Sequence, residues 1–397
     1  MKEGWTYKKL GEVCEIYNGN SINADFKKKH FFGATGGLPF IATKDVSTNG
    51  SIDYDNGVRI PNYDEYKVAP ANSVFVCAEG GSAGKKFAFV EQDVCFGNKL
   101  FCLNPKHNFL MGKYIYYFVQ SDVFKDQFYA LLSGLIGGVS AKKFQQIEIP
   151  VSSIDEQRSI ISRLDAAFAH IDSLKANAEK QLAEARQLFQ AELAECMRPK
   201  EGWEEKMLKE IGLTQTGSTP SKADPKNYGD YIPFIRPSEI DVDGCGNIEY
   251  DSEMKLSEQG LNNGRLFKKH SILMVCIGAT ISKVGYCTED VSCNQQINIL
   301  TPKDGYDYKF VYYAMRNKDF KDRVIKEGTS AQATLPIINK SKWEQLSLFV
   351  PHFTDQQTIA SRLDALSANI KKLEDVQRKT LAECDALKQA MLREVFE

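Results

Sequence analysis

The sequence predicts an α+β protein in which two similar globular domains are each followed by a long helix. Several short strings of residues return in the same order about 199 positions later. Each copy ends in a long segment whose apolar residues recur every three or four positions, as in an amphipathic helix. Between these segments lie β-branched runs and turn residues typical of strands. We expect the two helices to pack as an antiparallel coiled coil with pseudo-two-fold symmetry.

The internal repeat divides the chain into four segments. Matching strings are Lys2–Trp5 and Lys200–Trp203, Pro39–Ile41 and Pro233–Ile235, Val76–Cys77 and Val275–Cys276, Phe124–Asp126 and Phe320–Asp322, and Ser162–Ala166 and Ser361–Ala365. The period is too long for a solenoid and indicates two copies of a whole unit. The predicted segments are a first domain at 1–150, a central helix at 151–199, a second domain at 200–351 and a C-terminal helix at 352–397.

The two helical segments contain neither glycine nor proline at 155–197 and 355–397. Their apolar stripes include Leu174 in the first and Leu387 in the second, with a polar interruption near Gln377. Such helices of about 40 residues are roughly 60 Å long at about 1.5 Å per residue. A single apolar stripe does not stabilise so long a helix alone in water, and the other copy is the available partner.

The globular segments are predicted to mix strands with short helices. Apolar or alternating runs predict strands at 73–77, 147–149 and 271–275. Tyrosine-rich and phenylalanine-rich stretches predict one helix at 114–127 and one at 309–324.

Composition excludes several classes of protein. The chain has 397 residues, of which 43% are hydrophobic and 26% charged, as in ordinary globular proteins. No stretch approaches 18 apolar residues and the first residues do not resemble a signal peptide, so we expect a cytoplasmic protein without membrane contact. Ten cysteines without a CxxC pair and only five histidines argue against a disulfide framework or a metal centre. The net charge of −2 requires any DNA binding to come from locally placed cations.

No catalytic motif has the required spacing. The glycine-rich loop at 79–85 departs from a phosphate loop because Lys86, not Ser or Thr, follows its lysine. The strings at 104–107 and 224–227 lack the Pro-Pro-aromatic run of adenine methyltransferases. A Glu-x-Lys string at 253–255 has no copy in the first half. We therefore expect no catalytic residue, no bound metal and no cofactor on this chain.

Loops that combine glycine, hydroxyl, amide and cationic residues occur at matched places in both copies. Lys and Arg suit phosphate and guanine, Asn and Gln suit adenine edges, and Gly permits close backbone approach. The framework is retained while the loop residues differ, as expected of two readers of different sequences. The candidate DNA-binding residues are Asn20, Ser21, Lys44, Ser82, Lys85, Lys86, Asn98, Lys99, Lys142 and Lys143 in the first copy, and Ser218, Thr219, Lys222, Arg236, Ser238, Thr280, Lys283, Asn294, Gln295, Thr329 and Gln332 in the second.

An ordered set of motifs occurs twice. Each copy opens with a tryptophan motif, at Trp5–Glu12 and Trp203–Glu210, and continues with a Gly-Ser/Thr loop, at Gly19–Ser21 and Gly217–Pro220. A Pro-Phe-Ile strand entry follows, and then an Asn-Gln element at Asn294–Gln295, which is Asn98–Lys99 in the first copy. Each copy closes with a proline and an acid-Gln pair: Pro150 with Glu156–Gln157, and Pro351 with Asp355–Gln356. In this order the chain resembles the specificity subunits of type I restriction-modification systems over essentially its full length.

The resemblance implies a DNA-reading role. Such subunits carry two target-recognition domains separated by helical spacers, and each domain reads one half of a bipartite site in double-stranded DNA. They recruit two modification subunits, which bind S-adenosylmethionine and methylate adenine. Restriction subunits, which use ATP and magnesium, join the same complex. This implies a non-catalytic chain without a cofactor of its own.

Two other functions remain open from the sequence. One is a fragment of a fused restriction-methyltransferase enzyme, which would need a cofactor-binding motif. The other is a coiled-coil scaffold without DNA specificity, which would not need two elaborate domains with different loops. In the second domain the predicted contacts are foremost Arg236, Thr280, Lys283 and Gln295.

Overall fold

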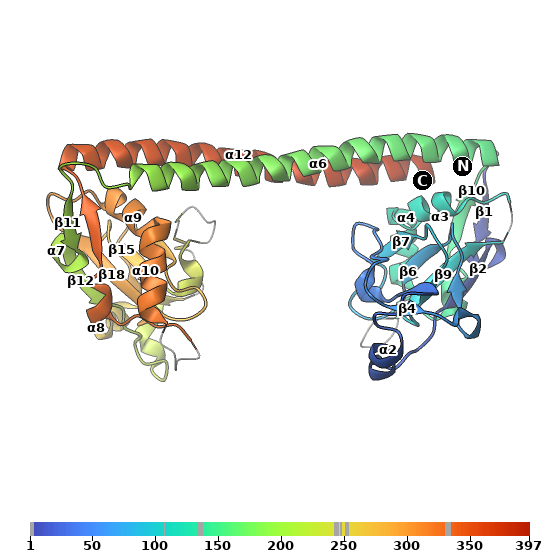
Figure 1. The fold of residues 1–397 in the computed structure, drawn as a ribbon, viewed down its shortest axis with the longest axis horizontal. Helices are drawn as coiled ribbons and strands as arrows, with labels where there is room; N and C mark the ends of the chain where they lie inside the picture. Colours follow the sequence, from blue (N-terminus) through green and yellow to red (C-terminus); the bar gives the residue numbers. More distant parts are fainter. Residues whose placement is uncertain are drawn as a thin grey trace. The chain divides into compact units, whose positions relative to one another are not determined.

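The computed structural model describes residues 4–106, 108–132, 138–241, 246, 248–250, 254–329 and 335–397. The chain forms two compact units, Met1–Asn177 with Lys379–Glu397, and Ala178–Arg378. Each unit contains one globular domain and a part of both long helices (Figure 1). The mixture of sheets and helices confirms the α+β class.

The domain of the first unit is built on a four-stranded antiparallel sheet in the order β2-β9-β6-β7. A second sheet, β4-β3-β8-β5, contains one parallel pair, β3 with β8, and a β1-β10 ribbon joins the two ends of the domain. Its elements are β1 (Thr6–Lys9), α1 (Leu10–Val13), β2 (Cys14–Asn18), α2 (Ala24–His30), β3 (Leu38–Ile41), η1 (Thr43–Asp45), β4 (Arg59–Ile60), η2 (Tyr63–Glu65), β5 (Val68–Ala69), β6 (Val74–Cys77), β7 (Phe87–Phe89), β8 (Val94–Phe96), β9 (Leu100–Pro105), α3 (Gly112–Phe118), α4 (Asp122–Ala130), α5 (Ala141–Phe144) and β10 (Glu148–Val151).

The domain of the second unit repeats this plan. Its main sheet has the order β12-β18-β15-β16, its smaller sheet is β14-β13-β17, and β11 pairs with β19. Its elements are β11 (Glu204–Met207), α7 (Leu208–Ile211), β12 (Gly212–Thr216), η3 (Pro225–Asn227), β13 (Tyr228–Ile235), η4 (Pro237–Glu239), β14 (Lys255–Leu256), α8 (Glu258–Asn263), β15 (Ile272–Val275), β16 (Val284–Tyr286), β17 (Ser292–Cys293), β18 (Ile297–Pro302), α9 (Tyr308–Arg316), α10 (Lys318–Gly328), α11 (Lys340–Trp343) and β19 (Ser347–Val350).

The central strands explain why their sequences are apolar throughout. In β6, Val74 and Val76 belong to the core shared with the helices, whereas Phe75 and Cys77 belong to the core between the two sheets. The strand β15 divides its side chains in the same way. Successive side chains of a strand point to opposite faces, so a strand covered on both faces needs apolar residues at every position.

The two predicted mid-domain helices are each two helices, which corrects the sequence prediction. Between α3 and α4, the buried Ser121 adopts an extended conformation, and its hydroxyl accepts a hydrogen bond from the Phe124 amide at 3.3 Å. Between α9 and α10, Asn317 is extended, with φ −59° and ψ 141°. The apolar spacing continues across each break because both helices of a pair pack on the same sheet.

The long helices are α6 (Ile154–Cys196) and α12 (Phe353–Phe396), and they run antiparallel. In the first unit, Lys388 Nζ lies 2.5 Å from Asp172 Oδ1, and Lys175 forms an ion pair with Asp385. Residue numbers therefore rise along one helix as they fall along the other. The second unit shows the same order, because Glu374 binds Arg186 whereas the earlier Arg362 binds the later Glu192.

Two members of the predicted apolar stripes lie outside the helix seam. Leu174 and Leu387 are 55% and 51% exposed. The side chain of Lys388 instead covers the seam, with Nζ 4.9 Å from the centre of the Phe168 ring. Long lysine stems can bury their methylene groups while the ammonium stays hydrated. The polar interruption at Gln377 is buried and donates a 2.9 Å hydrogen bond to Gln181.

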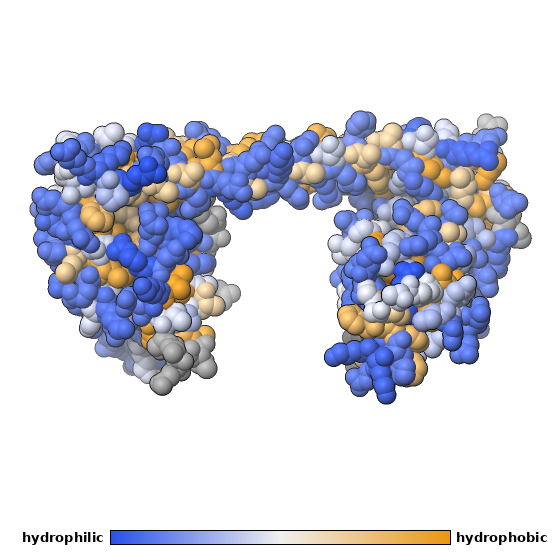
Figure 2. Space-filling model, viewed as in Figure 1, coloured by the Kyte–Doolittle hydropathy of each residue, from blue (hydrophilic) through white to orange (hydrophobic). Residues whose placement is uncertain are grey.

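Hydrophilic residues dominate the viewed surface of both long helices, with isolated apolar residues among them (Figure 2). Across the described ranges, no helix combines the length and the apolar character needed to cross a lipid bilayer.

The acid-Gln motif and the Ser-Arg-Leu-Asp motif fasten each long helix to its own domain. Gln157 is fully buried; its Oε1 accepts from the Met111 amide at 3.0 Å and its Nε2 donates to the Phe109 carbonyl at 2.8 Å. Further along the same helix α6, Asp165 accepts hydrogen bonds from Lys113, at 2.8 Å, and from Tyr117.

The second copy has the same fastening. Gln356 is buried, accepts from the Asp307 amide at 2.9 Å and donates to the Pro351 carbonyl at 2.9 Å. Asp364 accepts from Tyr313 at 2.7 Å and from Lys309. Burial, together with the Asp364 carboxylate, raises the pKa of Tyr313, so its phenol stays protonated and donates this bond. These repeated motifs are therefore structural.

Candidate nucleic-acid interface

Four loops of the second domain meet at the end of its main sheet, and we call them the second loop cluster: 216–222, 235–240, 276–283 and 293–297. Backbone and lysine hydrogen bonds join them. They are Ser218 N to Cys293 O at 2.9 Å, Asn294 N to Ile235 O at 3.2 Å, Cys276 N to Gln296 O at 2.8 Å, and Lys283 Nζ to Ile240 O at 3.4 Å. The fold thus brings together residues that are far apart in the sequence.

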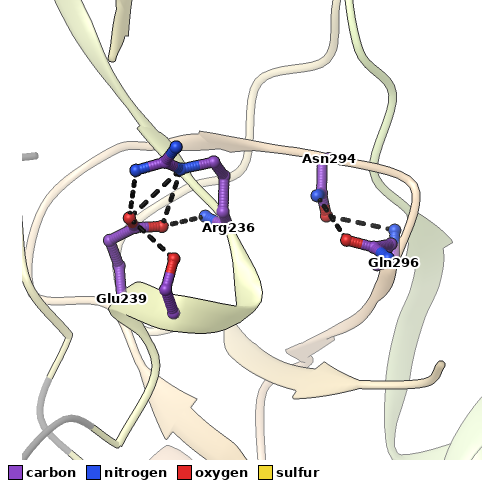
Figure 3. A network of polar contacts seen from close by, with 5 residues as sticks. Arg236, Glu239, Asn294 and Gln296 are labelled. Atoms are coloured by element: carbon purple, nitrogen blue, oxygen red, sulfur yellow. Dashed lines mark hydrogen bonds and ion pairs between the residues drawn. The ribbon is translucent and has the colours of Figure 1, made fainter. Parts of the chain in front are cut away.

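Arg236 is held by an acidic residue of the same loop (Figure 3). Its Nη2 donates to Glu239 Oε1 at 2.6 Å, and its backbone amide donates to Oε2 at 2.7 Å. Ser238 donates to the same carboxylate at 3.0 Å. Glu239 is buried, whereas the Arg236 side chain is 38% exposed. A guanidinium with a fixed plane is preorganised for a bidentate contact with a base or a phosphate.

The turn at 294–296 presents Gln295. Asn294 donates to the Gln296 side chain at 3.0 Å, and its own Oδ1 accepts from the Gln296 amide at 3.1 Å (Figure 3). Between them, the exposed Gln295 accepts a 2.6 Å hydrogen bond from Thr219. This orients its carboxamide and leaves the amide nitrogen able to donate to an acceptor such as a base edge.

The remaining candidates of the second domain differ in their surroundings. Thr280 and Lys222 are exposed, whereas Lys283 is tied back to the Ile240 carbonyl. Thr329 is exposed and donates to the Ile325 carbonyl of its own helix at 2.8 Å. Gln332 lies outside the described residues.

The first domain has an equivalent first loop cluster at 18–21, 41–45, 77–86 and 96–100. The joining hydrogen bonds are Asn20 N to Phe96 O, Gly97 N to Ile41 O, Ala78 N to Lys99 O and Lys86 Nζ to Thr43 O, each at 2.9 Å. Lys67 adds a bond from its amide to Asn20 Oδ1 at 2.7 Å. Both copies therefore build the same loop scaffold.

Within the first cluster, the candidates with exposed side chains are Ser21, Lys44, Lys85, Asn98 and Lys99. Asn20, Ser82 and Lys86 are half-buried. Asn20 and Lys86 make hydrogen bonds that join the loops of the cluster, to the Phe96 and Thr43 carbonyls.

Lys142 and Lys143 lie beside the first loop cluster, not in it. They are exposed on α5. Val139, before this helix, donates to the Ala78 carbonyl at 3.1 Å, and Gln145, after it, accepts from the Gly11 amide at 3.0 Å. The helix therefore leads away from the loops toward the start of β2.

The backbone bonds correct one predicted correspondence between the copies. Asn294 donates to the end of β13, and in the first copy Gly97 donates to the end of β3. Gly97 therefore matches Asn294, and Asn98 matches Gln295. The side-chain carboxamide of Asn294 has no counterpart in the first copy, because glycine has no side chain. The pairing of Gly19 with Gly217 is retained, since a Cβ at either would lie 2.0 Å from a carbonyl oxygen of the facing loop.

Chemically, both clusters offer hydrogen-bond donors, acceptors and cations. Within the described ranges, His, Cys, Asp and Glu side chains do not gather in groups of three that could hold a metal ion. The glycine-rich loop forms a turn in which Ala83 N donates to Gly80 O at 2.9 Å. In the second loop cluster, burial raises the pKa of the Cys276 thiol to about 11, so this thiol stays neutral.

Lys67 and a run of three lysines also lie beside the first cluster and were not predicted from the sequence. Lys67 donates to Asn20 and also to the Asn18 carbonyl, at 2.8 Å. Lys27, Lys28 and Lys29 form a basic run on α2. The run itself was a visible charge signal, whereas nothing in the sequence distinguished Lys67.

The comparison with protein families agrees with this duplicated arrangement. The model of the type I restriction modification DNA specificity domain matches residues 2–184 and 200–382. The chain belongs to this family. The two matches fall on the two copies of the repeat.

Similar proteins support the family. The StySPI specificity subunit of Salmonella potsdam is 22% identical over 100% of this chain and 89% of its own length. The MjaIX specificity subunit of Methanocaldococcus jannaschii is 29% identical over 46% of this chain and 42% of its own length. The matched family model describes a DNA specificity domain, and this chain contains two copies of that domain.

Solved structures share the fold. A chain from a study of the assembly and conformational transition of a type I R-M system has a TM-score of 0.77 at 17% identity, covering 100% of this chain and 98% of that one. The HsdS subunit from Thermoanaerobacter tengcongensis has a TM-score of 0.56 at 17% identity, with 100% and 97% coverage. At this identity the likeness concerns the fold.

Proposed function

We propose that each loop cluster reads one half of a bipartite sequence in double-stranded DNA. The observation that supports this most strongly is the occurrence of one loop scaffold twice with different side chains. Arg236 in the second copy stands where Ala42 stands in the first, since both amides bond to the acid three residues later. A shared scaffold with different donors and acceptors suits two readers of different base sequences.

We propose further that the paired helices set the distance between the half-sites and dock two modification subunits. Leu188 and Leu387 occupy matched positions of the two copies and are 61% and 51% exposed. Matched apolar positions on the two helices fit two copies of one partner. Restriction subunits complete the proposed complex.

In this proposal the chain is the non-catalytic subunit of a cytoplasmic enzyme complex. S-adenosylmethionine belongs to the modification subunits, and ATP and magnesium belong to the restriction subunits. The alternative of a fused restriction-methyltransferase fragment would require methyl transfer by the chain alone. A scaffold without specificity would bind all DNA sequences equally.

Reconstitution separates these functions. The purified chain, with and without its modification subunits, is incubated with S-adenosylmethionine and a pool of random DNA, and bound and methylated sequences are read. We expect methylation at one bipartite sequence, only when both components are present. Methyl transfer by the chain alone would show that it is an enzyme, and methylation without sequence preference would refute the proposal.

A further inference from the structure

The helix α2 of the first domain carries a run of consecutive basic residues. The helix α2 carries Lys27, Lys28, Lys29 and His30 in succession, with Asp25 as its one acidic residue. Lys28, Lys29 and His30 are exposed. Within the described part of the chain, none of the three lysines pairs with a carboxylate. The exposed Lys28 and Lys29 are therefore available to a partner.

The helix is held firmly on the domain. Asn23 caps it, with Oδ1 accepting from the Asp25 amide at 2.9 Å. Phe31, directly after it, is 8% exposed and packs in a small core with Phe40. The Lys27 ammonium lies 5.0 Å from the centre of the Phe40 ring. A fixed helix loses little freedom when its lysines bind, which favours a permanent contact surface.

The helix α2 is connected to two loops of the first loop cluster. Asn20 of the cluster precedes the Asn23 cap by three residues, and Phe40, which the Lys27 ammonium contacts, directly precedes the cluster loop 41–45. A duplex seated on the cluster would thus continue past α2. The exposed lysines would face its backbone, the most concentrated linear array of negative charge available to them.

At the matched place, the described residues of the second domain form no such basic helix. After its matched Gly217 loop, the chain forms the short η3 turn, capped by Asp224, whose Oδ1 accepts from the Lys226 amide at 3.1 Å. In this stretch Lys222 and Lys226 are balanced by Asp224 and Asp230. The copies therefore differ in charge outside the loops that would read bases.

We infer that α2 is a clamp for DNA backbone phosphates beside the half-site of the first domain, independent of base sequence. This inference rests on the proposed function. It makes the two domains unequal, because the first supplies additional, salt-dependent affinity. The phosphates are those of the duplex that carries the recognised site.

The test uses Lys28→Gln/Lys29→Gln in the full chain, assembled with its modification subunits. These side chains are exposed, so the Lys27–Phe40 contact and the fold stay intact. Binding to the cognate duplex is measured across a series of salt concentrations. We expect the slope of log affinity against log salt to become shallower by about 0.9 per lost phosphate contact, or about 1.8 for both. The methylated sequence should not change.

Lys28→Arg/Lys29→Arg is the matched control and should keep the original slope. An unchanged slope in the glutamine variant would overturn the inference. If the same variant also assembled less well with the restriction subunits, α2 would be assigned to an acidic protein surface instead. A changed methylated sequence would also overturn it, because α2 would then read bases. Failure of the unaltered complex to select any sequence would refute the proposed function itself.

Discussion

At the scale of single residues, the interface depends on side chains that are oriented by neighbours within the same loop. Glu239 orients Arg236, and Thr219 orients Gln295. Substitution of Glu239 or Thr219 should therefore change DNA discrimination even if neither residue contacts DNA. A preorganised donor gives more discrimination than a mobile one, because less freedom is lost when it binds.

Arg236→Ala should relax discrimination at one base position of the second half-site, by about 1–3 kcal/mol, because a bidentate base contact is lost. Competition binding by the assembled complex, with duplexes altered at each position in turn, measures this. Glu239→Gln should give a smaller change at the same position. Arg158→Ala, on an arginine 66% exposed in α6, is the control and should leave all positions unchanged. Equal weakening of every duplex would instead assign Arg236 to a phosphate.

Much of the site was predictable at this scale. Residue type and repetition identified the loops that contribute Arg236, Gln295 and Lys99. The shift that pairs Asn98 with Gln295 was not predictable, because it depends on which amide bonds to the neighbouring strand. The inward turn of Lys283 toward a carbonyl was hidden for the same reason: residue type does not determine the direction of a long side chain.

At the scale of elements, each domain is fastened to its helix by a buried glutamine and a carboxylate. Long helices and apolar strands were predictable, because their periodicity extends over many residues. The break between α3 and α4 was not predictable, because the buried Ser121 cap interrupts a helical spacing of apolar residues that otherwise continues. The exposure of Leu174 was not predictable, because the methylene groups of a lysine, here Lys388, can cover the apolar seam in place of a leucine.

Gln356→Ala should destabilise the second unit by about 1–3 kcal/mol, since it leaves the Asp307 amide and the Pro351 carbonyl without their buried partner. Gln357→Ala is the matched control: its side chain is exposed, and the change should stay within about 0.5 kcal/mol. Urea unfolding in a Trp5→Phe background follows this unit through Trp203 and Trp343. Equal midpoints for the two variants would contradict the fastening role.

At the scale of the whole molecule, both helices run through both units, so any change of length must be made in both. Four residues inserted after Asn177 and four after Arg378, where the units divide, lengthen the pair by about 6 Å and rotate the stripes by only about 40°. At about 3.4 Å per base pair, the gap between half-sites should widen by one or two base pairs. Methylation mapping of the variant checks this, and an active variant with the original gap would refute the spacing role.

In the proposed function, the two domains of this chain are independent readers of DNA sequence. Replacement of residues 200–351 by the same region of another specificity subunit, followed by methylation sequencing of the host, tests it most directly. We expect one half of the methylated sequence to change while the other half and the gap stay the same. A change in both halves, or in neither, would contradict it.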